Sequence, residues 1–597
     1  MSDLHFSPRP NRASEINWRE WGDGPFRESE ATGKPVVLAI SAVWCHWCHV
    51  MDETTYSTDA VIRLLNERFI PTRVDNDRRP DVNARYNMGG WPTTAVLTPD
   101  GEIVHGGTYI PPDAMLRLLG QIDRFFSEPD NRLELAEQTR RVKDERARGR
   151  SIDGEAAMGT LDNRTAETVL GQLEEQFDQE FGGFGDEQKF PQTSTLHFML
   201  DHWARTRDSR DERMTLATLR GMAGGGMYDH VEGGFFRYST TRDFSVPHFE
   251  KMLEDLGGLV LACSRAGAAF AADDLGLVAR DVKRYLDASL WQAEAGAYGG
   301  SQDADESYFQ LDAAGRLNRV APYVDRTIFT SWNAETARSL LLSAPLLGGA
   351  AGEFDDWTAR GLAILETLWS RLLREGLMCR YSDGEPHVRG LLGDQAWSIA
   401  AALAAHAATG EGLWLERAGR LIAASDALYD ESRGYADRLS SEGAPGRLSD
   451  VAVPFNENAL MARSLLAYAA AAAQPAMADR AREILGRFER DYRRYGVFAA
   501  LYGSAVMDAI EPPVSVVIVG APLEAARLRR AALSTTWPAI SVIPVDPITE
   551  SERLERLGHS ALADSSPVAY LCRGTACFAR VTTASDLSDA LARSPQA

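Results

Sequence analysis

Apolar residues in the first 127 positions recur with two different spacings. Short runs of β-branched and aliphatic residues predict buried strands, and apolar residues three and four positions apart predict amphipathic helices. In chain order, these patterns predict a strand at 36–40, a helix at 59–69, a strand at 70–75, a short helix at 81–88, a hairpin at 95–105 and a helix at 115–126. The alternation predicts an α/β domain over residues 1–127.

From position 161 to 510 the spacing is helical almost throughout. Glycine-rich aromatic loops, such as 181–185 and 232–236, recur after alternate helices, and strands are scarce. Repeated helix pairs predict an (α/α)6 toroid whose inner helices surround a central cavity, with an elongated α-solenoid as the alternative. Six pairs complete a ring, which favours the toroid. The predicted helices lie near 162–181, 193–206, 212–226, 246–267, 272–291, 331–347, 354–373, 391–409, 411–427, 453–473, 476–493 and 498–508.

Two further segments complete the predicted organisation. Residues 128–160 are charged and poor in large apolar residues, which predicts a connector whose first half is compatible with a helix. Residues 511–597 hold strand-like runs at 514–519, 540–545 and 568–572 and a helical segment at 523–532. The predicted fold class is multidomain: an α/β domain, an all-α toroid over 161–510 and a small C-terminal α/β subdomain.

Composition narrows the partners and the compartment. The net charge of −22 argues against nucleic acid as a partner, because phosphate binding needs a basic surface. The chain opens without a secretory signal pattern and holds no apolar run of the roughly 20 residues that span a bilayer. Six cysteines in 597 residues are too few for a secreted disulfide framework. We therefore expect a cytoplasmic protein with no membrane association.

The chemistry of the first domain centres on Cys45 and Cys48, a C-x-x-C pair between a predicted strand and a predicted helix. A helix N-terminus favours a thiolate on the first cysteine, and a protonated His46 would add to this effect. We expect Cys45 to attack a disulfide and Cys48 to resolve the mixed disulfide, at a potential above that of thioredoxin. Trp91 and Pro92 stand where thioredoxin-like domains carry a cis-proline that binds the substrate chain. The first domain is therefore predicted to be thioredoxin-like.

Three alternatives to this redox interpretation remain. C-x-x-C-H also matches haem attachment, which normally follows export. A structural zinc site would need a second ligand pair, and the next cysteine is Cys263. The fold could also serve a packing or binding role, because the strand position where thioredoxins bury an acid is apolar here, at or near Ala39. No cofactor and no metal are predicted.

Polar residues in the toroid loops go beyond what packing requires. Asp229, Arg237, His248, Glu250 and Lys251 lie in 224–255. The proline at 247 suits the first turn of a helix, which would place the last three at its mouth. There His248 and Glu250 could transfer protons, and the others could bind a sugar hydroxyl. The alternative is a capping and salt-bridge cluster that only fixes the loop.

Further candidates follow along the chain. Asp303 and Asp305 resemble a glycosidase acid/base pair or a metal loop, although they lie too close in sequence for separate roles to be assigned. Lys189, Trp332 and Asn333 are additional ligand-binding candidates, with Trp332 able to stack on a sugar ring. In the tail, a second redox pair at Cys572 and Cys577 is less favoured than structural or incidental cysteines, because four residues separate them.

Several motifs together carry a family resemblance. They are Cys45-His46-Trp47-Cys48-His49-Val50-Met51, Gly90-Trp91-Pro92, Gly182-Gly183-Phe184-Gly185, Lys189-Phe190-Pro191, Pro247-His248-Phe249-Glu250-Lys251-Met252-Leu253 and Thr330-Ser331-Trp332-Asn333. This set resembles the thioredoxin-domain proteins related to the spermatogenesis-associated thioredoxin-like protein. The resemblance implies a thioredoxin-like domain joined to a six-hairpin toroid similar to those of N-acylglucosamine 2-epimerases and glycosidases, and a role in redox regulation or carbohydrate metabolism.

Two classes of function follow, with different partners. The first is a thiol–disulfide oxidoreductase that acts on protein thiols or disulfides. The second is a carbohydrate-active enzyme, epimerase- or glycosidase-like, that binds a small sugar-like ligand and uses the thioredoxin-like domain for regulation or structure. A non-catalytic scaffold is a third possibility. Sugar epimerases of this shape use paired histidines, and no spacing of the toroid histidines pairs them here.

Overall fold

The computed structural model describes residues 4–153, 159–348, 351–440 and 443–593. The chain forms two compact units. The first unit comprises Met1–Ala156 together with Ala436–Ala452, and the second comprises Ala157–Tyr435 together with Val453–Ala597. Each unit is described by itself below.

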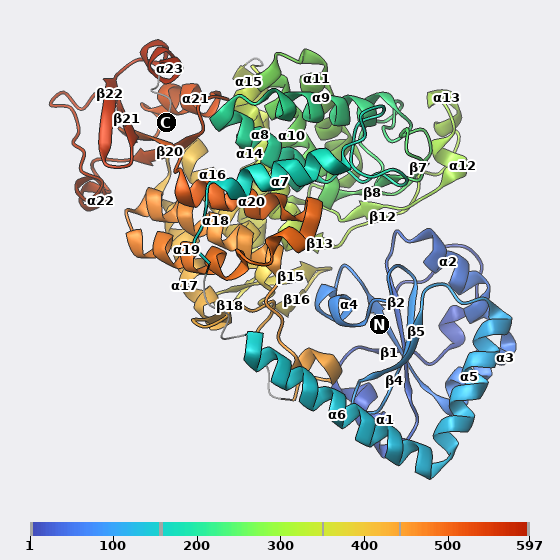
Figure 1. The fold of residues 1–597 in the computed structure, drawn as a ribbon. Helices are drawn as coiled ribbons and strands as arrows, with labels where there is room; N and C mark the ends of the chain where they lie inside the picture. Colours follow the sequence, from blue (N-terminus) through green and yellow to red (C-terminus); the bar gives the residue numbers. More distant parts are fainter. Residues whose placement is uncertain (1–3, 154–158, 349–350, 441–442, 594–597) are drawn as a thin grey trace. The chain divides into compact units, whose positions relative to one another are not determined.

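The first unit is built on a five-stranded sheet with the strand order β1-β3-β2-β4-β5 (Figure 1). Its strands are β1 (Arg19–Glu20), β2 (Val36–Ser41), β3 (Ile70–Asp75), β4 (Thr93–Leu97) and β5 (Ile103–Gly107). β2 pairs in parallel with β3 and antiparallel with β4. Its helices are α1 (Asp23–Thr32), α2 (His46–Glu53), α3 (Asp59–Arg68), α4 (Pro80–Tyr86), α5 (Pro112–Ser127) and α6 (Pro129–Asp153).

Strand β2 is buried on both faces, which explains its continuous apolar run. Val37 and Ala39 pack in one core with residues of α2, α3 and α5. Val36, Leu38 and Ile40 pack in a second core with residues of α1 and α4. This is the thioredoxin-like arrangement predicted from the order of the elements. The predicted connector, 128–160, is helical over α6, beyond its first half, and Lys143 of α6 pairs with Asp100 at 2.6 Å.

Residues 436–452 fold onto the first unit, although their sequence position lies inside the predicted toroid range. Arg85 of α4 donates to Asp437 at 2.7 Å, and the Tyr86 hydroxyl accepts from the backbone N–H of Arg447 at 2.7 Å. Leu448 joins the core that contains Tyr86. Gly101 and Gly446 both have positive φ and touch so closely that a Cβ on Gly101 would lie 2.3 Å from the Cα of Gly446.

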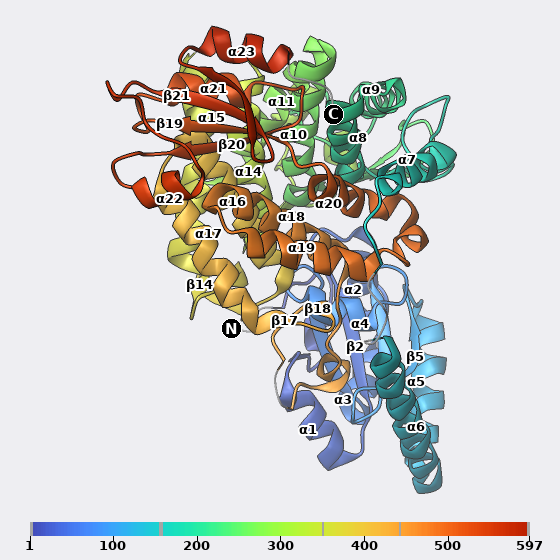
Figure 2. The same ribbon diagram turned by 60° about the vertical axis from the view of Figure 1, so that its left-hand side comes forward.

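The second unit contains a closed ring of helices, which confirms the (α/α)6 toroid and rules out the solenoid (Figures 1 and 2). Each inner helix contacts the next, and the last contacts the first. The inner helices are α8 (Thr193–Thr206), α10 (Leu253–Phe270), α14 (Thr330–Leu346), α16 (Leu392–Thr409), α18 (Phe455–Ala472) and α20 (Ala500–Ile510). The outer helices are α7 (Arg164–Gln176), α9 (Ser209–Gly224), α11 (Asp273–Tyr285), α15 (Ala351–Thr367), α17 (Gly412–Ala424) and α19 (Pro475–Phe488).

One predicted helix starts in the wrong place. Pro247 is not in the first turn of a helix, because β7 (Pro247–His248) pairs with β6 (Tyr238–Ser239). The following strand β8 (Lys251–Met252) pairs with β11 (Ser301–Gln302), and α10 begins only at Leu253. His248, Glu250 and Lys251 therefore lie on an extended segment that leads into an inner helix, and not on that helix.

The C-terminal part of the second unit is a four-stranded sheet with the order β20-β19-β21-β22. Its strands are β19 (Val514–Val519), β20 (Ile540–Val545), β21 (Val568–Arg573) and β22 (Ala576–Val581). Helices α21 (Ala526–Leu533) and α23 (Ala584–Ala592) pack on one face and α22 (Ser551–Arg556) on the other (Figure 2). The predicted small α/β subdomain is confirmed. Among the described residues, no helix has the length and apolarity needed to cross a bilayer.

Candidate functional site

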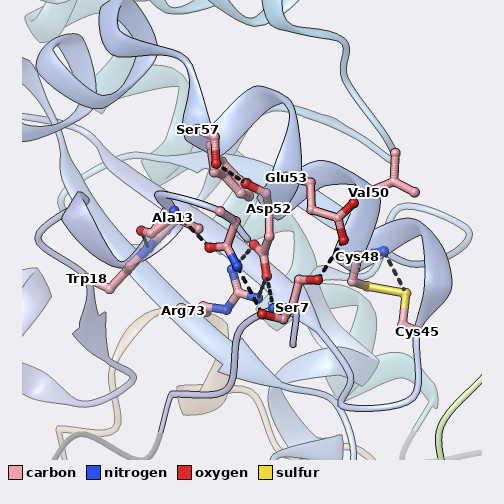
Figure 3. A network of polar contacts seen from close by, with 12 residues as sticks. Ser7, Ala13, Trp18, Cys45, Cys48, Val50, Asp52, Glu53, Ser57 and Arg73 are labelled. Carbon is pink, nitrogen blue, oxygen red and sulfur yellow. Dashed lines mark hydrogen bonds and ion pairs between the residues drawn. A yellow bond between two sulfur atoms is a disulfide. The ribbon is translucent and has the colours of Figure 1, made fainter. Parts of the chain in front are cut away.

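The dithiol lies at the start of helix α2, the first helix after strand β2. Cys45 is the N-cap of α2, and its Sγ accepts the backbone N–H of Cys48 at 3.2 Å (Figure 3). The two sulfurs form a disulfide, and the exposed fractions of the two residues are only 4% and 2%. A sulfur at this position receives a backbone N–H and the positive end of the helix dipole, and both stabilise a thiolate.

Aromatic rings surround the dithiol. Trp47, between the two cysteines, is half exposed, and its ring lies 5.3 Å from that of Tyr109. Trp44 is buried, donates to Asp77 at 2.7 Å and packs edge-on against Trp91. The Trp91–Pro92 peptide bond is cis, as predicted. An exposed tryptophan beside a reactive sulfur gives a polypeptide an apolar surface to bind.

The histidines of the motif differ in their environment. His49 is buried on α2, and burial, reinforced by the nearby His5 and Arg9, lowers its pKa to about 3. This imidazole therefore stays neutral and adds no positive charge to the dithiol at neutral pH. The ring of His46 is partly buried and lies edge-on to that of Trp47. Its predicted help to the Cys45 thiolate stays a prediction.

A buried ion pair lies within the same helix–sheet layer. Ala39 is buried and stands opposite Arg73 in the β2–β3 register, so no acid comes from that position of β2. Asp52, four residues after Cys48 on α2, binds the guanidinium of Arg73 through both carboxylate oxygens at 2.8 and 2.9 Å (Figure 3). The backbone N–H of Ser7 donates to the same carboxylate at 3.0 Å. The sequence interpretation missed this ion pair. The only sign of it in the sequence is that Asp52 stands one helical turn after Cys48.

In the toroid, Lys251 and Asp229 form a buried ion pair. Lys251 Nζ donates to Asp229 at 2.7 Å and to the carbonyl of Gly233 at 2.8 Å, and Arg316 donates to the same carboxylate oxygen at 2.7 Å. Burial lowers the pKa of Lys251 to about 8, against the pull of Asp229. The Asp229 carboxylate also accepts the backbone N–H of Val231 at 3.0 Å, which closes the loop.

The same cluster occurs a second time, one hairpin earlier. Lys189 Nζ donates to Asp178 and to the carbonyl of Gly182, both at 2.6 Å, and Arg242 donates to the same carboxylate at 2.7 Å. Each aspartate sits four residues before the first glycine of a Gly-Gly-Phe loop and each lysine is fully buried. Repetition at two loops favours the loop-fixing interpretation of Asp229, Lys251 and Lys189.

Asn333 is also one of a repeated set. Its side chain accepts from the N–H of Tyr298 at 2.9 Å and donates to the same residue's carbonyl at 3.0 Å. Asn458 holds Tyr435 in the same way, and Gln395 holds Met378. Each amide stands near the start of an inner helix and fixes the preceding strand.

The remaining candidates, Asp303, Asp305 and Trp332, make local contacts. Asp305 caps the short helix α12 (Glu306–Phe309) through the N–H of Tyr308, and Asp303 accepts the N–H of Ala304. The ring of Trp332 packs on Phe329 at 4.4 Å. These contacts do not place the carboxylates of Asp303 and Asp305 opposite each other as an acid and a base. Ligand contacts of the three stay predictions.

His248 and Glu250 form a pair with a different character. His248 Nδ1 lies 2.5 Å from Glu250 Oε2, the glutamate is fully buried, and its Oε1 makes no hydrogen bond to any described residue. The imidazole is partly exposed and stacks on Tyr238, which stacks in turn on Phe190. The backbone N–H of Arg237 donates to the carbonyl of Glu250 at 2.8 Å. A buried carboxylate behind a partly exposed imidazole is the arrangement of a general base and its orienting acid.

Carboxyls with raised pKa values lie at the starts of the adjoining inner helices. Burial, reinforced by Glu254, raises the pKa of Asp255 in the first turn of α10 to about 7, although Arg237 opposes this. Burial and Glu254 raise the pKa of Glu335 on α14 to about 8, although Arg338 opposes this. The sequence interpretation named neither residue. In the sequence, the only sign of these two residues is that each is an acid near the start of a predicted inner helix.

The sequence is similar to a known protein family and to several known proteins. Residues 9–145 match the Thioredox_DsbH family model, described as "Protein of unknown function, DUF255". Human spermatogenesis-associated protein 20 is 36% identical over 319 residues, which cover 49% of this chain and 39% of that protein. An uncharacterized protein of Caenorhabditis elegans is 32% identical over 361 residues, which cover 57% of this chain and 47% of that protein. The chain thus spans less than half the length of these curated relatives.

Solved structures resemble the helical part at low identity. Cellobiose 2-epimerase from Spirochaeta thermophila is 15% identical with a TM-score of 0.46, covering 60% of this chain and 98% of that chain. A family 76 glycoside hydrolase of Bacteroides thetaiotaomicron is 11% identical with a TM-score of 0.41, covering 58% and 98%. The sequence comparisons thus show that residues 9–145 match the thioredoxin-like DUF255 family model and that about half of the chain is similar to spermatogenesis-associated protein 20.

Proposed function

We propose that the chain is a thiol–disulfide oxidoreductase whose reactive pair is Cys45 and Cys48. The observation that carries the proposal is the position of Cys45 Sγ, which caps helix α2, accepts the Cys48 N–H and lies in bonding contact with the second sulfur. In the reduced protein the same N–H and the helix dipole stabilise the thiolate of Cys45, which is the attacking form.

The reaction proceeds by two exchanges. The Cys45 thiolate attacks a substrate disulfide, forms a mixed disulfide and releases one substrate thiolate, which takes a proton from water. Cys48, once deprotonated, attacks Cys45 Sγ and releases the second substrate thiolate. The substrate gains two electrons, and the protein is left with the Cys45–Cys48 disulfide. An external dithiol regenerates the reduced protein, and protein disulfides are the proposed substrates because Trp47 offers them an apolar surface.

Insulin reduction tests the proposal. Wild-type protein is expected to reduce insulin with a dithiol as the electron source, Cys45→Ser to show only the background rate, and Cys48→Ser to accumulate mixed disulfides. A redox titration is expected to place the couple above the roughly −270 mV of thioredoxin. Equal insulin reduction by wild type and Cys45→Ser would remove the dithiol mechanism, and a potential well below that of thioredoxin would contradict the stabilised thiolate.

A second candidate function rests on His248 and Glu250. The oriented imidazole of His248 supplies a base, and Glu335, whose pKa is raised to about 8, supplies a carboxyl that keeps its proton at pH 7. Transformations of hydroxyl-rich substrates require both a base and an acid. The substrate class would be a small sugar. Screening unmodified and epimerised sugars for turnover, with His248→Ala as the control, tests this candidate. Turnover that His248→Ala leaves unchanged would exclude the pair.

A further inference from the structure

The hairpin of strands β21 and β22 carries a second pair of sulfurs. Cys572 and Cys577 occupy paired positions of the two strands and form a disulfide. Cys572 is buried and Cys577 is exposed, so one sulfur faces the protein and the other can be reached by reagents from solvent. This disulfide lies in the second unit and is no part of the Cys45–Cys48 site.

A histidine is held beside this pair by the fold. His559 follows helix α22, and its backbone N–H donates to the carbonyl of Leu554 at 3.2 Å. Its ring stacks on Tyr570, at 4.6 Å between ring centres, and the Tyr570 hydroxyl donates to the carbonyl of Ser560 at 2.7 Å. Tyr570 and Cys572 are two residues apart on β21 and so share a face of the sheet. This places His559 Nε2 3.9 Å from Cys572 Sγ.

The three side chains together have the composition of a metal site. One ligand atom each from His559, Cys572 and Cys577 lie within 4.8 Å of one another. Ligands of one tetrahedral zinc ion, bonded at about 2.0–2.3 Å, stand roughly 3.3–3.8 Å apart. His559 Nε2 is already close to that distance from Cys572 Sγ, and the two sulfurs must move apart once their bond is reduced.

We propose that reduction of the Cys572–Cys577 disulfide creates a zinc-binding site made of Cys572, Cys577 and His559. Three segments of the C-terminal subdomain present the ligands: the loop after α22, strand β21 and strand β22. Two thiolates and one imidazole select zinc over magnesium or calcium, which prefer oxygen ligands. Three protein ligands leave the fourth position to water.

The two states of the site exclude each other, because both use the same two sulfurs. A dithiol or phosphine reductant supplies two electrons to the disulfide, and two protons from water complete the two thiols. Zinc binding then releases those two protons as the thiolates coordinate the ion. A small-molecule disulfide reverses the step: it accepts the two electrons and leaves as two thiolates, while the Cys572–Cys577 bond forms again and the ion is released. The hairpin is therefore a redox-controlled zinc site.

Cobalt(II) titration of the full-length chain tests the proposal. The chain carries Cys45→Ser and Cys48→Ser, so that the first dithiol contributes nothing, and is reduced with a phosphine and kept free of oxygen. We expect one cobalt ion per chain, a thiolate-to-cobalt charge-transfer band in the near ultraviolet and displacement of cobalt by one equivalent of zinc. The same chain with the disulfide intact is expected to bind no ion at this site.

Ligand variants separate this site from adventitious binding. Cys577 is exposed on its strand, so Cys577→Ser is not expected to disturb the fold. Circular dichroism checks that the variant is folded. It and His559→Asn are expected to weaken cobalt binding more than about tenfold, because even residues outside the ligand set change affinity by that much. His105→Asn, at an exposed position of β5, is the matched control. Absence of a charge-transfer band in the reduced chain, or unchanged affinity in Cys577→Ser and His559→Asn, overturns the proposal.

Discussion

Asp52 and Arg73 form a buried ion pair in which both carboxylate oxygens meet both terminal nitrogens of the guanidinium. The aspartate lies on the dithiol helix and the arginine on the neighbouring strand β3 of the central sheet. The pair therefore ties helix α2, and with it Cys48 one turn earlier, to the sheet. Its carboxylate is fully engaged by Arg73 and Ser7, which suits a positioning role better than proton transfer.

Asp52→Asn should destabilise the first unit strongly. It removes one charge and leaves the Arg73 guanidinium buried without its partner, and breaking such a pair typically costs about 3–5 kcal/mol. Urea unfolding monitored by tryptophan fluorescence measures the change. Arg12→Gln, which removes the exposed ion pairs with Glu15 and Asp59, is the control and should leave the free energy of unfolding nearly unchanged. An Asp52→Asn protein as stable as this control would show that the pair is dispensable.

The two lysine clusters should respond alike to substitution. Lys251→Met and Lys189→Met each leave a buried aspartate that keeps one arginine but loses its lysine, so each should lower the free energy of unfolding of the second unit by about 3–5 kcal/mol. Chemical denaturation compares them, with Arg220→Met as the control because its pair with Asp274 is exposed. A large loss for Lys189→Met and none for Lys251→Met would speak for a ligand-binding role of Lys251.

Local patterns predicted most of the elements, and long-range contacts explain what they missed. Strand β3, helix α8 and the strands β19 and β20 have the predicted bounds, because their apolar spacing reflects the layer that each one faces. The docking of 436–452 on the first unit depends on partners more than 300 positions away, such as Arg85 and Asp437. Pairing of β8 with β11 likewise overrode the helical pattern that follows Pro247.

The same limit applies to the site residues. The dithiol and Pro92 were found because each is a local motif with a fixed spacing. Asp229 and Lys251 drew attention as charges in a loop, but only the structure shows that Asp178 and Lys189 repeat their contacts. The pKa values of Asp255 and Glu335 are raised mainly by burial, and then by the charge of Glu254, which lies on another helix than Glu335. No local pattern shows how deeply either carboxyl is buried.

Stability of the second unit should fall as the pH rises from about 5 to 8. The pKa of Glu335 is raised to about 8 in the folded state, so between its ordinary value and 8 the folded protein holds a proton that the unfolded chain has lost. The unfolded state then binds fewer protons, and unfolding becomes easier as pH increases. Urea denaturation at a series of pH values measures the slope, which Glu335→Gln should flatten and the exposed control Glu294→Gln should leave unchanged. Equal slopes in all three proteins would contradict the raised pKa.

Trp47→Ala should weaken the binding of protein substrates without changing the chemistry of the sulfurs. The indole is 50% exposed, stands between the two cysteines and packs on Tyr109, so it offers apolar surface to a bound polypeptide. Truncation of a tryptophan at the centre of a binding surface typically costs about 2 kcal/mol or more, which corresponds to a rise in KM for insulin of roughly 30-fold. The rate with a small symmetrical disulfide should stay within about twofold, since that reagent needs only the Cys45 thiolate. Trp369→Ala, on the toroid, is the control for nonspecific loss of a tryptophan. A parallel loss of rate with both substrates would mean that Trp47 acts on the reactivity of Cys45 and not on substrate binding.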